Sequence, residues 1–149
     1  MKDLIKRIAL WLWQLPQNLI ALLLYNILGH WSYYGGKYRD NYIIVCKAAL
    51  SSFALGDYMF LTPFSNERVM DHELGHCRQS EILGPLYIPI IVVPSLLNNL
   101  YDRLITFMGK EYDYFSFYTE KWANKLGGYS PTNIKDLNHL RSTLNHVKS

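Results

Sequence analysis

The chain has 149 residues, half of them hydrophobic and 15% aromatic, which is enough apolar material for one domain with one core. Its net charge is only +3, from 15 basic and 12 acidic residues, and no basic run suggests a nucleic-acid site. We therefore exclude nucleic-acid binding and treat residues 1–149 as a single domain. Cys46 and Cys77 do not make a disulfide framework and are expected to be reduced and buried.

The first 28 residues form an apolar, helical segment with an expected break near Pro16. Residues 1–13 begin with basic residues and turn apolar, as an anchor or signal peptide would, but 19–28 are too few to span a bilayer. We favour an uncleaved amphipathic or partly inserted hairpin, with a buried helix pair of a soluble protein as the alternative. Residues 86–97 contain two prolines and are expected to form a packed or re-entrant segment.

Together with 12 tyrosines and 4 tryptophans, which favour interfaces and the membrane–water boundary, these segments predict a membrane-associated protein. The expected location is the bacterial inner membrane. The sequence makes no prediction of the oligomeric state.

Residues 31–61 have the composition of a small antiparallel sheet. Residues 42–45 are rich in strand formers, and residues 53–55 and 58–61 flank a Gly-Asp turn as two paired strands. The Tyr-Tyr-Gly-Gly run at 33–36 is interpreted as a turn.

Helices are expected on the C-terminal side of this sheet. Ser65 or Asn66 is expected to cap a helix that ends near Leu83, before a Gly-Pro pair. After a long connection, residues 113–126 read as a second helix, and residues 130–147 as a C-terminal amphipathic helix. The order of elements predicts an α+β fold, mainly α, with the small sheet before the helix at 66–83.

That helix carries His72, Glu73 and His76 in an HExxH pattern. Residues 72 and 76 are one helical turn apart, so both imidazoles can reach one ion, expected to be Zn²⁺. Glu73 lies on the flank of the same face, where it can take a proton from a metal-bound water. The alternative is a helix on which these three residues only make surface or core hydrogen bonds.

A catalytic zinc site needs a third protein ligand, and Glu120 is the best candidate. It lies on the second predicted helix, with Asn124 one turn further on the same face, where its carbonyl can accept a hydrogen bond from a ligand imidazole. The alternative is that Glu120 is an exposed helix carboxylate.

Other possible ligands fit less well. His30 is a distant possibility, His139 and His146 lie off the apolar face of the last predicted helix, and Glu81 points away from His72. Gln79 and Ser80 share the ligand face and are candidates for lining the cleft. Tyr112, Tyr114 and Tyr118 are candidates for stabilising an oxyanion, with no basis for choosing among them.

The HExxH helix followed by Glu120 and Asn124 resembles the gluzincin type of zinc metallopeptidase. The resemblance implies that His72, His76 and Glu120 bind zinc, that Glu73 is the general base, and that residues 31–128 form a minimal zincin-like core. It also implies a substrate-aligning sheet edge within 52–61. Gluzincins often have Asp where this chain has Asn124, which keeps an acceptor but weakens the pairing.

A second resemblance covers residues 13–17, 72–97 and 117–128, which are similar to small uncharacterised bacterial HExxH proteins associated with membranes. It transfers no function.

Three functions follow as hypotheses. The first is a metallopeptidase that cleaves a peptide or protein substrate near a membrane, with membrane lipid as a possible further partner. The second is a zinc hydrolase of a lipid or cell-wall substrate, suggested by the apolar segments around the motif. The third is a non-enzymatic membrane-associated protein with a structural metal.

Overall fold

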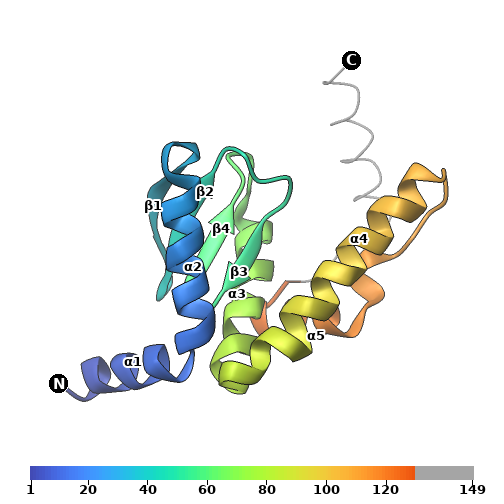
Figure 1. The fold of residues 1–149 in the computed structure, drawn as a ribbon. Helices are drawn as coiled ribbons and strands as arrows, with labels where there is room; N and C mark the ends of the chain where they lie inside the picture. The colour runs from blue at the N-terminus through green and yellow to red at the C-terminus, as the bar shows by residue number, and fades with distance from the viewer. Residues whose placement is uncertain (130–149) are drawn as a thin grey trace.

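A computed structural model describes residues 1–129, in which helices predominate and four strands form one small sheet (Figure 1). The helical segments are α1 (Lys2–Trp13), α2 (Leu15–Leu28), η1 (Gly29–Trp31), α3 (Glu67–Leu83), η2 (Gly84–Leu86), η3 (Ile88–Val92), α4 (Val93–Phe107), η4 (Tyr114–Ser116) and α5 (Tyr118–Gly127). The strands are β1 (Ser32–Tyr38), β2 (Asn41–Cys46), β3 (Phe53–Leu55) and β4 (Tyr58–Leu61). The expected α+β, mainly α fold is confirmed; the helix expected at 130–147 lies outside the described residues.

The N-terminal segment is a bent pair of helices. The helical run ends at Trp13, and Pro16 lies in the first turn of α2, where a helix needs no N–H donor. Buried Gln14 between the two helices donates to Asp57 Oδ1 over 3.1 Å and so fixes the bend to the sheet. The break near Pro16 is therefore confirmed, but the expected hairpin is wrong, because the pair is bent by 82°.

Within residues 1–129, no single helix is long and apolar enough to cross a membrane. The bent pair of residues 2–13 and 15–31 meets the length and composition criteria when its two parts are taken together.

The sheet has the order β1-β2-β4-β3 and is mixed, which corrects the expected antiparallel sheet. Strands β1 and β2 pair antiparallel, as do β3 and β4, but β2 and β4 run parallel. The loop at 47–52 carries the chain past the position beside β2, so the second strand of the β3–β4 hairpin fills that position. Strand β3 is consequently an edge strand.

The glycine pair in β1 marks a bulge. Residues 33–36, interpreted above as a turn, belong to a strand whose register against β2 shifts between Tyr34 and Gly36. Gly36 has φ +105°, a conformation that favours glycine over residues with a side chain. The turn interpretation is wrong because glycine is as typical of bulges as of turns.

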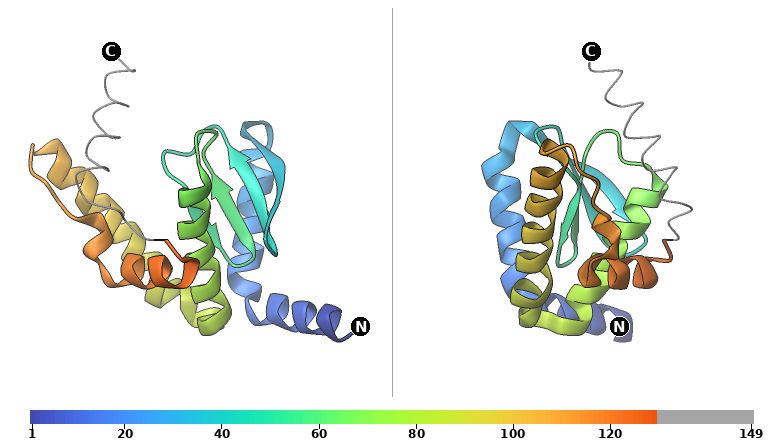
Figure 2. Two further views of the ribbon diagram at one scale, coloured as in Figure 1. Left: turned by 180° about the vertical axis from the view of Figure 1, so that it is seen from behind. Right: turned by 90° about the vertical axis from the view of Figure 1, so that its right-hand side faces the viewer.

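The hydrophobic core has one part on each face of the sheet. Buried residues on the face that packs against α2 and η3 are Ala21, Ile44, Leu55, Phe60, Tyr87 and Ile91. Those on the face that packs against α3 are Ile43, Ala54, Met59, Leu61, Leu74 and Cys77. Neighbouring strand residues alternate between the two parts, as the period of two requires, and Figure 2 shows the sheet between α2 and α3. Both cysteines are buried and free, as expected.

Helices α3 and α5 are in close backbone contact because both carry glycine where they meet. A Cβ added to Gly75 would lie 1.9 Å from the carbonyl oxygen of Ala123. A Cβ added to Gly127 would lie 1.8 Å from the carbonyl oxygen of Asp71. Neither backbone oxygen can move aside without moving its helix, so the two glycines set the distance between α3 and α5.

We expect Gly75→Ala to destabilise the protein although alanine favours helices. Alanine gains up to about 1 kcal/mol of helix propensity, whereas forcing the backbones apart costs about 3 kcal/mol. Urea unfolding of the variant should show a net loss of about 2 kcal/mol. Lys125→Ala, on the exposed side of α5, is the matched control and should change little. A Gly75→Ala protein as stable as the wild type would contradict the close packing.

Much of the long connection expected before residue 113 is helical. Segments η3 and α4 continue from Ile88 to Phe107 as one helical run, and Pro89 and Pro94 lie in the first turns of η3 and α4. Pro89 breaks no hydrogen bond in the first turn of the run, whereas Pro94 lies inside it, and the Ile90 carbonyl four residues before Pro94 accepts a hydrogen bond from the Tyr118 hydroxyl instead. In the sequence the two prolines favour a broken segment, so the sequence does not predict α4.

Candidate metal centre

The start of α3 places the HExxH residues well inside the helix. The side chain of Asn66 caps α3 by accepting a hydrogen bond from the Val69 N–H over 3.1 Å, so the second of the two predicted caps is the one used. His72, Glu73 and His76 follow one to three turns later and are buried against the sheet and α5. Buried ionisable residues at this density are rare unless they pair or bind an ion.

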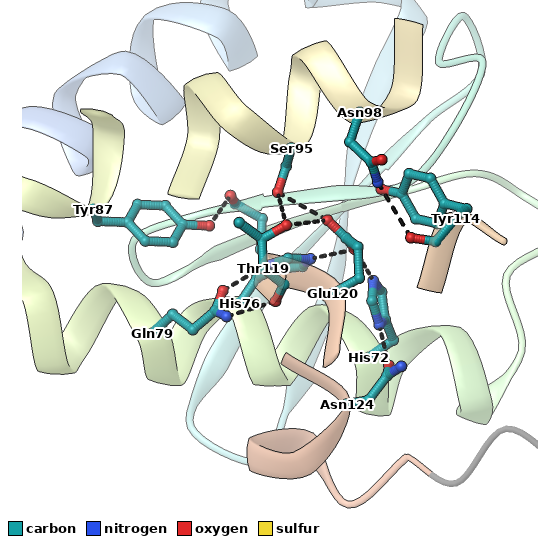
Figure 3. A network of polar contacts seen from close by, with 11 residues as sticks. His72, His76, Gln79, Tyr87, Ser95, Asn98, Tyr114, Thr119, Glu120 and Asn124 are labelled. Carbon is teal, nitrogen blue, oxygen red and sulfur yellow. Dashed lines mark hydrogen bonds and ion pairs between the residues drawn. The ribbon is translucent and has the colours of Figure 1, made fainter. Parts of the chain in front are cut away.

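Helix α5 brings Glu120 to the two histidines. Glu120 Oε2 lies 3.1 Å from Nε2 of His72 and 3.3 Å from Nε2 of His76, and the Glu120 side chain is fully buried (Figure 3). One ligand atom from each of the three residues lies within 4.8 Å of the others. The structure thus brings the three predicted ligands together, and the alternative of an exposed Glu120 is wrong.

The opposite nitrogen of each ring faces an amide oxygen. Nδ1 of His72 lies 2.6 Å from Oδ1 of Asn124, where the sequence placed an acceptor, and Nδ1 of His76 lies 2.8 Å from Oε1 of Gln79. The Gln79 amide is held in this orientation because its Nε2 donates to the Thr119 carbonyl over 2.7 Å. An amide oxygen only accepts, so each Nδ1 carries a hydrogen and donates it.

The far oxygen of Glu120 is held by two hydroxyl groups. Ser95 on α4 donates to Oε1 over 2.8 Å, and Thr119 donates to the same atom over 2.9 Å. Burial alone would raise the pKa of Glu120, but the hydrogen bonds and charges of the two histidines hold it well below its usual range. The carboxylate therefore presents one fixed oxygen, Oε2, to both rings.

This arrangement suits a cation. With hydrogen on each Nδ1, a charged ring at His72 or His76 donates from Nε2 to Oε2 of Glu120, whereas a neutral ring points its Nε2 lone pair at the same negative oxygen. Three electron-rich atoms at this range repel one another unless a positive species lies among them. Two imidazole nitrogens and one carboxylate oxygen are also a common ligand set of catalytic zinc. The side chains present fit a divalent metal.

A cavity of about 370 Å³ adjoins the cluster and is lined by His72, Glu73 and His76 together with mainly apolar side chains. Among the described residues, Oε2 of Glu73 is buried and has no hydrogen-bond partner. Burial raises the pKa of Glu73 to about 7, an effect that His72 opposes and the charge of Glu120 reinforces. Glu73 thus offers a carboxyl group beside the cluster without being one of its three converging residues.

Among the three tyrosine candidates, only Tyr114 lines this cavity. The hydroxyl of Tyr112 donates to Asn98, and that of Tyr118 donates to the Ile90 carbonyl. Burial and the charge of Glu120 raise the pKa of Tyr114, which keeps its hydroxyl protonated and able to donate. Of the three tyrosines, the position of the cavity therefore favours Tyr114, which the sequence alone could not distinguish.

The remaining sequence candidates lie elsewhere or have structural roles. His30 is exposed in η1, Glu81 pairs with Arg78, and buried Ser80 accepts a hydrogen bond from Gln17. His139 and His146 lie outside the described residues. Sequence reasoning missed Ser95 and Thr119; the position of Thr119 beside Glu120 was the one available signal.

No known protein-family model, no curated protein and no solved structure matches this chain. We therefore base the functional proposal on the geometry of the cluster and its cavity.

Proposed function

We propose that the protein is a zinc-dependent peptidase that acts near a membrane. The observation that carries this proposal is the convergence of His72, His76 and Glu120 beside a cavity lined by Glu73, whose Oε2 is buried without a hydrogen-bond partner among the described residues. A purely structural metal site is normally closed by four protein ligands. Three converging ligands, an adjoining cavity and a glutamate that lines it favour hydrolysis over a structural role.

Zinc held by these three side chains would acidify water and polarise a substrate carbonyl. Glu73 accepts the proton that water loses on attack, and it returns that proton to the leaving amine, so its carboxyl group ends each cycle unchanged. Tyr114 lines the same cavity, and its protonated hydroxyl would serve as a donor to a developing oxyanion. Ser95 and Thr119 hold the Glu120 carboxylate in one orientation through the cycle.

A peptide substrate is supported by the edge strand. Phe53, Ala54 and Leu55 of β3 line the cavity, and an exposed strand edge can pair with an extended peptide. The mainly apolar lining of the cavity also favours a second candidate, hydrolysis of a lipid. The Ala54 carbonyl of β3 already accepts a hydrogen bond from Tyr87 over 2.9 Å, so one acceptor that a peptide would need on this strand edge is occupied.

Metal analysis and substrate assays on the purified full-length protein test this proposal. We expect one zinc ion per chain by elemental analysis, retained by His30→Ala and lost in His72→Ala. His30 is exposed and outside the cluster, so it is the matched control. Digestion of a peptide library, read by mass spectrometry, should yield cleaved products.

Failure to bind zinc after reconstitution would contradict the proposal. Release of fatty acid or headgroup from phospholipid vesicles, with no peptide cleaved, would replace peptidase by the second candidate.

A further inference from the structure

Two helices beside the cavity expose continuous apolar stripes. Exposed large apolar side chains on α2 are Leu15, Leu19, Ile20, Leu23 and Ile27, and those on α4 are Val93, Leu96, Leu97, Leu100, Tyr101, Leu104 and Phe107. Leu97 and Leu100, for example, are 61% and 64% exposed. Stripes of this length are unusual on a surface that only meets water.

Most of these two segments lacks charge, with buried Asp102 and exposed Arg103 near the end of α4 as the exceptions. Residues 8–36 and 82–101 contain no Asp, Glu, Lys or Arg. A protein interface normally has a polar rim and regular hydrogen bonds, for which these stripes offer few groups. A surface that is apolar over two helices, and uncharged along α2 and residues 93–101 of α4, matches hydrocarbon better than it matches a protein partner.

The cavity opens between the stripes. Ile20 on α2 and Leu96 on α4 both line the cavity, and they are 39% and 64% exposed. Figure 1 shows α2 and α4 rising on either side of β3. The exposed residues that line the cavity therefore include one from each apolar stripe, together with Ser51 of the loop before β3.

Helix α1 supplies charge complementarity to an anionic surface. It has no buried residue, and it exposes Leu4, Ile5 and Ile8 while carrying Lys2 and Lys6. An amphipathic helix with this pattern is typical of binding in the headgroup region of anionic lipid.

Two exposed tryptophans strengthen the match to a bilayer. Trp13 and Trp31 flank α2 and are 50% and 64% exposed. Indole rings at the ends of an apolar helix are typical of the boundary between headgroups and hydrocarbon.

We propose that α1, α2 and α4 dock on an anionic bilayer and that the cavity receives an apolar segment of a membrane-inserted polypeptide directly from that bilayer. The docking stands independently of catalysis; the substrate class rests on the proposed peptidase function. Entry between Ile20 and Leu96 brings an apolar segment past an apolar wall to Glu73 without exposing it to water.

The first experiment measures docking on vesicles. Tryptophan fluorescence of the full-length protein should shift to the blue, and brominated lipid should quench it, on vesicles with anionic phosphatidylglycerol more than on phosphatidylcholine alone. The double variant Leu97→Glu/Leu100→Glu should bind at least about tenfold more weakly, because it loses two leucines that the bilayer would bury. Phe64→Glu, a matched change at an exposed residue before α3, should bind as the wild type does.

The outcomes of this experiment separate docking from catalysis. Glu73→Gln should bind vesicles normally, since docking needs no hydrolysis. No binding to either vesicle would overturn the proposal. So would a wild-type dimer in solution that Leu97→Glu/Leu100→Glu converts to monomer, because the stripes would then cover a second copy.

The second experiment measures the route of the substrate. A quenched fluorescent apolar peptide carrying an acyl anchor should be cleaved on vesicles with at least about tenfold higher kcat/KM than the same peptide without the anchor. Leu97→Glu/Leu100→Glu should lose this advantage and still cleave the unanchored peptide. Equal rates for both peptides would overturn entry from the bilayer. Fatty-acid release with neither peptide cleaved would replace the peptide by a lipid and would also refute the peptidase proposal, with docking intact.

Discussion

Glu73→Gln is expected to abolish hydrolysis while leaving the metal in place. Glutamine has the shape of glutamate but cannot take a proton from water, so the rate should fall by about 1,000-fold or more. The three ligand side chains are unchanged, and zinc content should stay near one per chain. Single-turnover cleavage and elemental analysis of the same sample measure both quantities.

Glu111→Gln is the matched control, because Glu111 is exposed and lies outside the cluster. Its rate and zinc content should equal those of the wild type. Full activity of Glu73→Gln would refute Glu73 as the base. Loss of zinc from Glu73→Gln would show instead that Glu73 is itself a ligand.

Glu120→Gln is expected to have the largest effect on metal affinity. The change removes the anionic member of the three proposed ligands, so zinc affinity should fall by roughly 100-fold or more. At a metal concentration 1,000 times the wild-type Kd, bound metal stabilises the fold by about 4 kcal/mol. In a chain of this size that corresponds to about 10 °C in Tm, which the variant should largely lose.

Calorimetric titration with zinc and thermal scans with and without chelator measure these effects. Glu67→Gln, in the exposed first turn of α3, is the control and should keep both affinity and Tm shift. If Glu120→Gln bound zinc as tightly as the wild type, the carboxylate would not be a ligand.

The parts of the site that could be predicted from the sequence are those encoded locally. A cap at Asn66 and the one-turn spacing of His72 and His76 specify the helix and the face that carries both rings. Glu120 and Asn124 are likewise one turn apart, so one helix face brings a candidate ligand and an acceptor together. The β3–β4 hairpin followed from a two-residue turn between apolar runs.

The parts that were missed depend on contacts between distant segments. Ser95 contacts Glu120 from α4, a helix that the sequence does not predict because of its prolines. Nothing near Ser95 in the sequence indicates that contact. The parallel pairing of β2 with β4 depends on the course of the loop between them. The sequence places Gln79 on the ligand face. Its hydrogen bond with His76 could not be predicted, because the Gln79 amide is oriented by the Thr119 carbonyl, which comes from a distant segment.

The close approach of α3 and α5 also yields a signature for recognising proteins built in the same way. In this chain the carboxylate of α5 reaches two imidazoles on α3 where the two backbones nearly touch, and a side chain is missing at both contact points. Gly75 lies between the histidines, and Gly127 lies seven residues after Glu120. Chains that pair H-E-x-G-H with a later E-x-x-x-N-x-x-G therefore have the steric freedom to pack the two helices as closely as this one does.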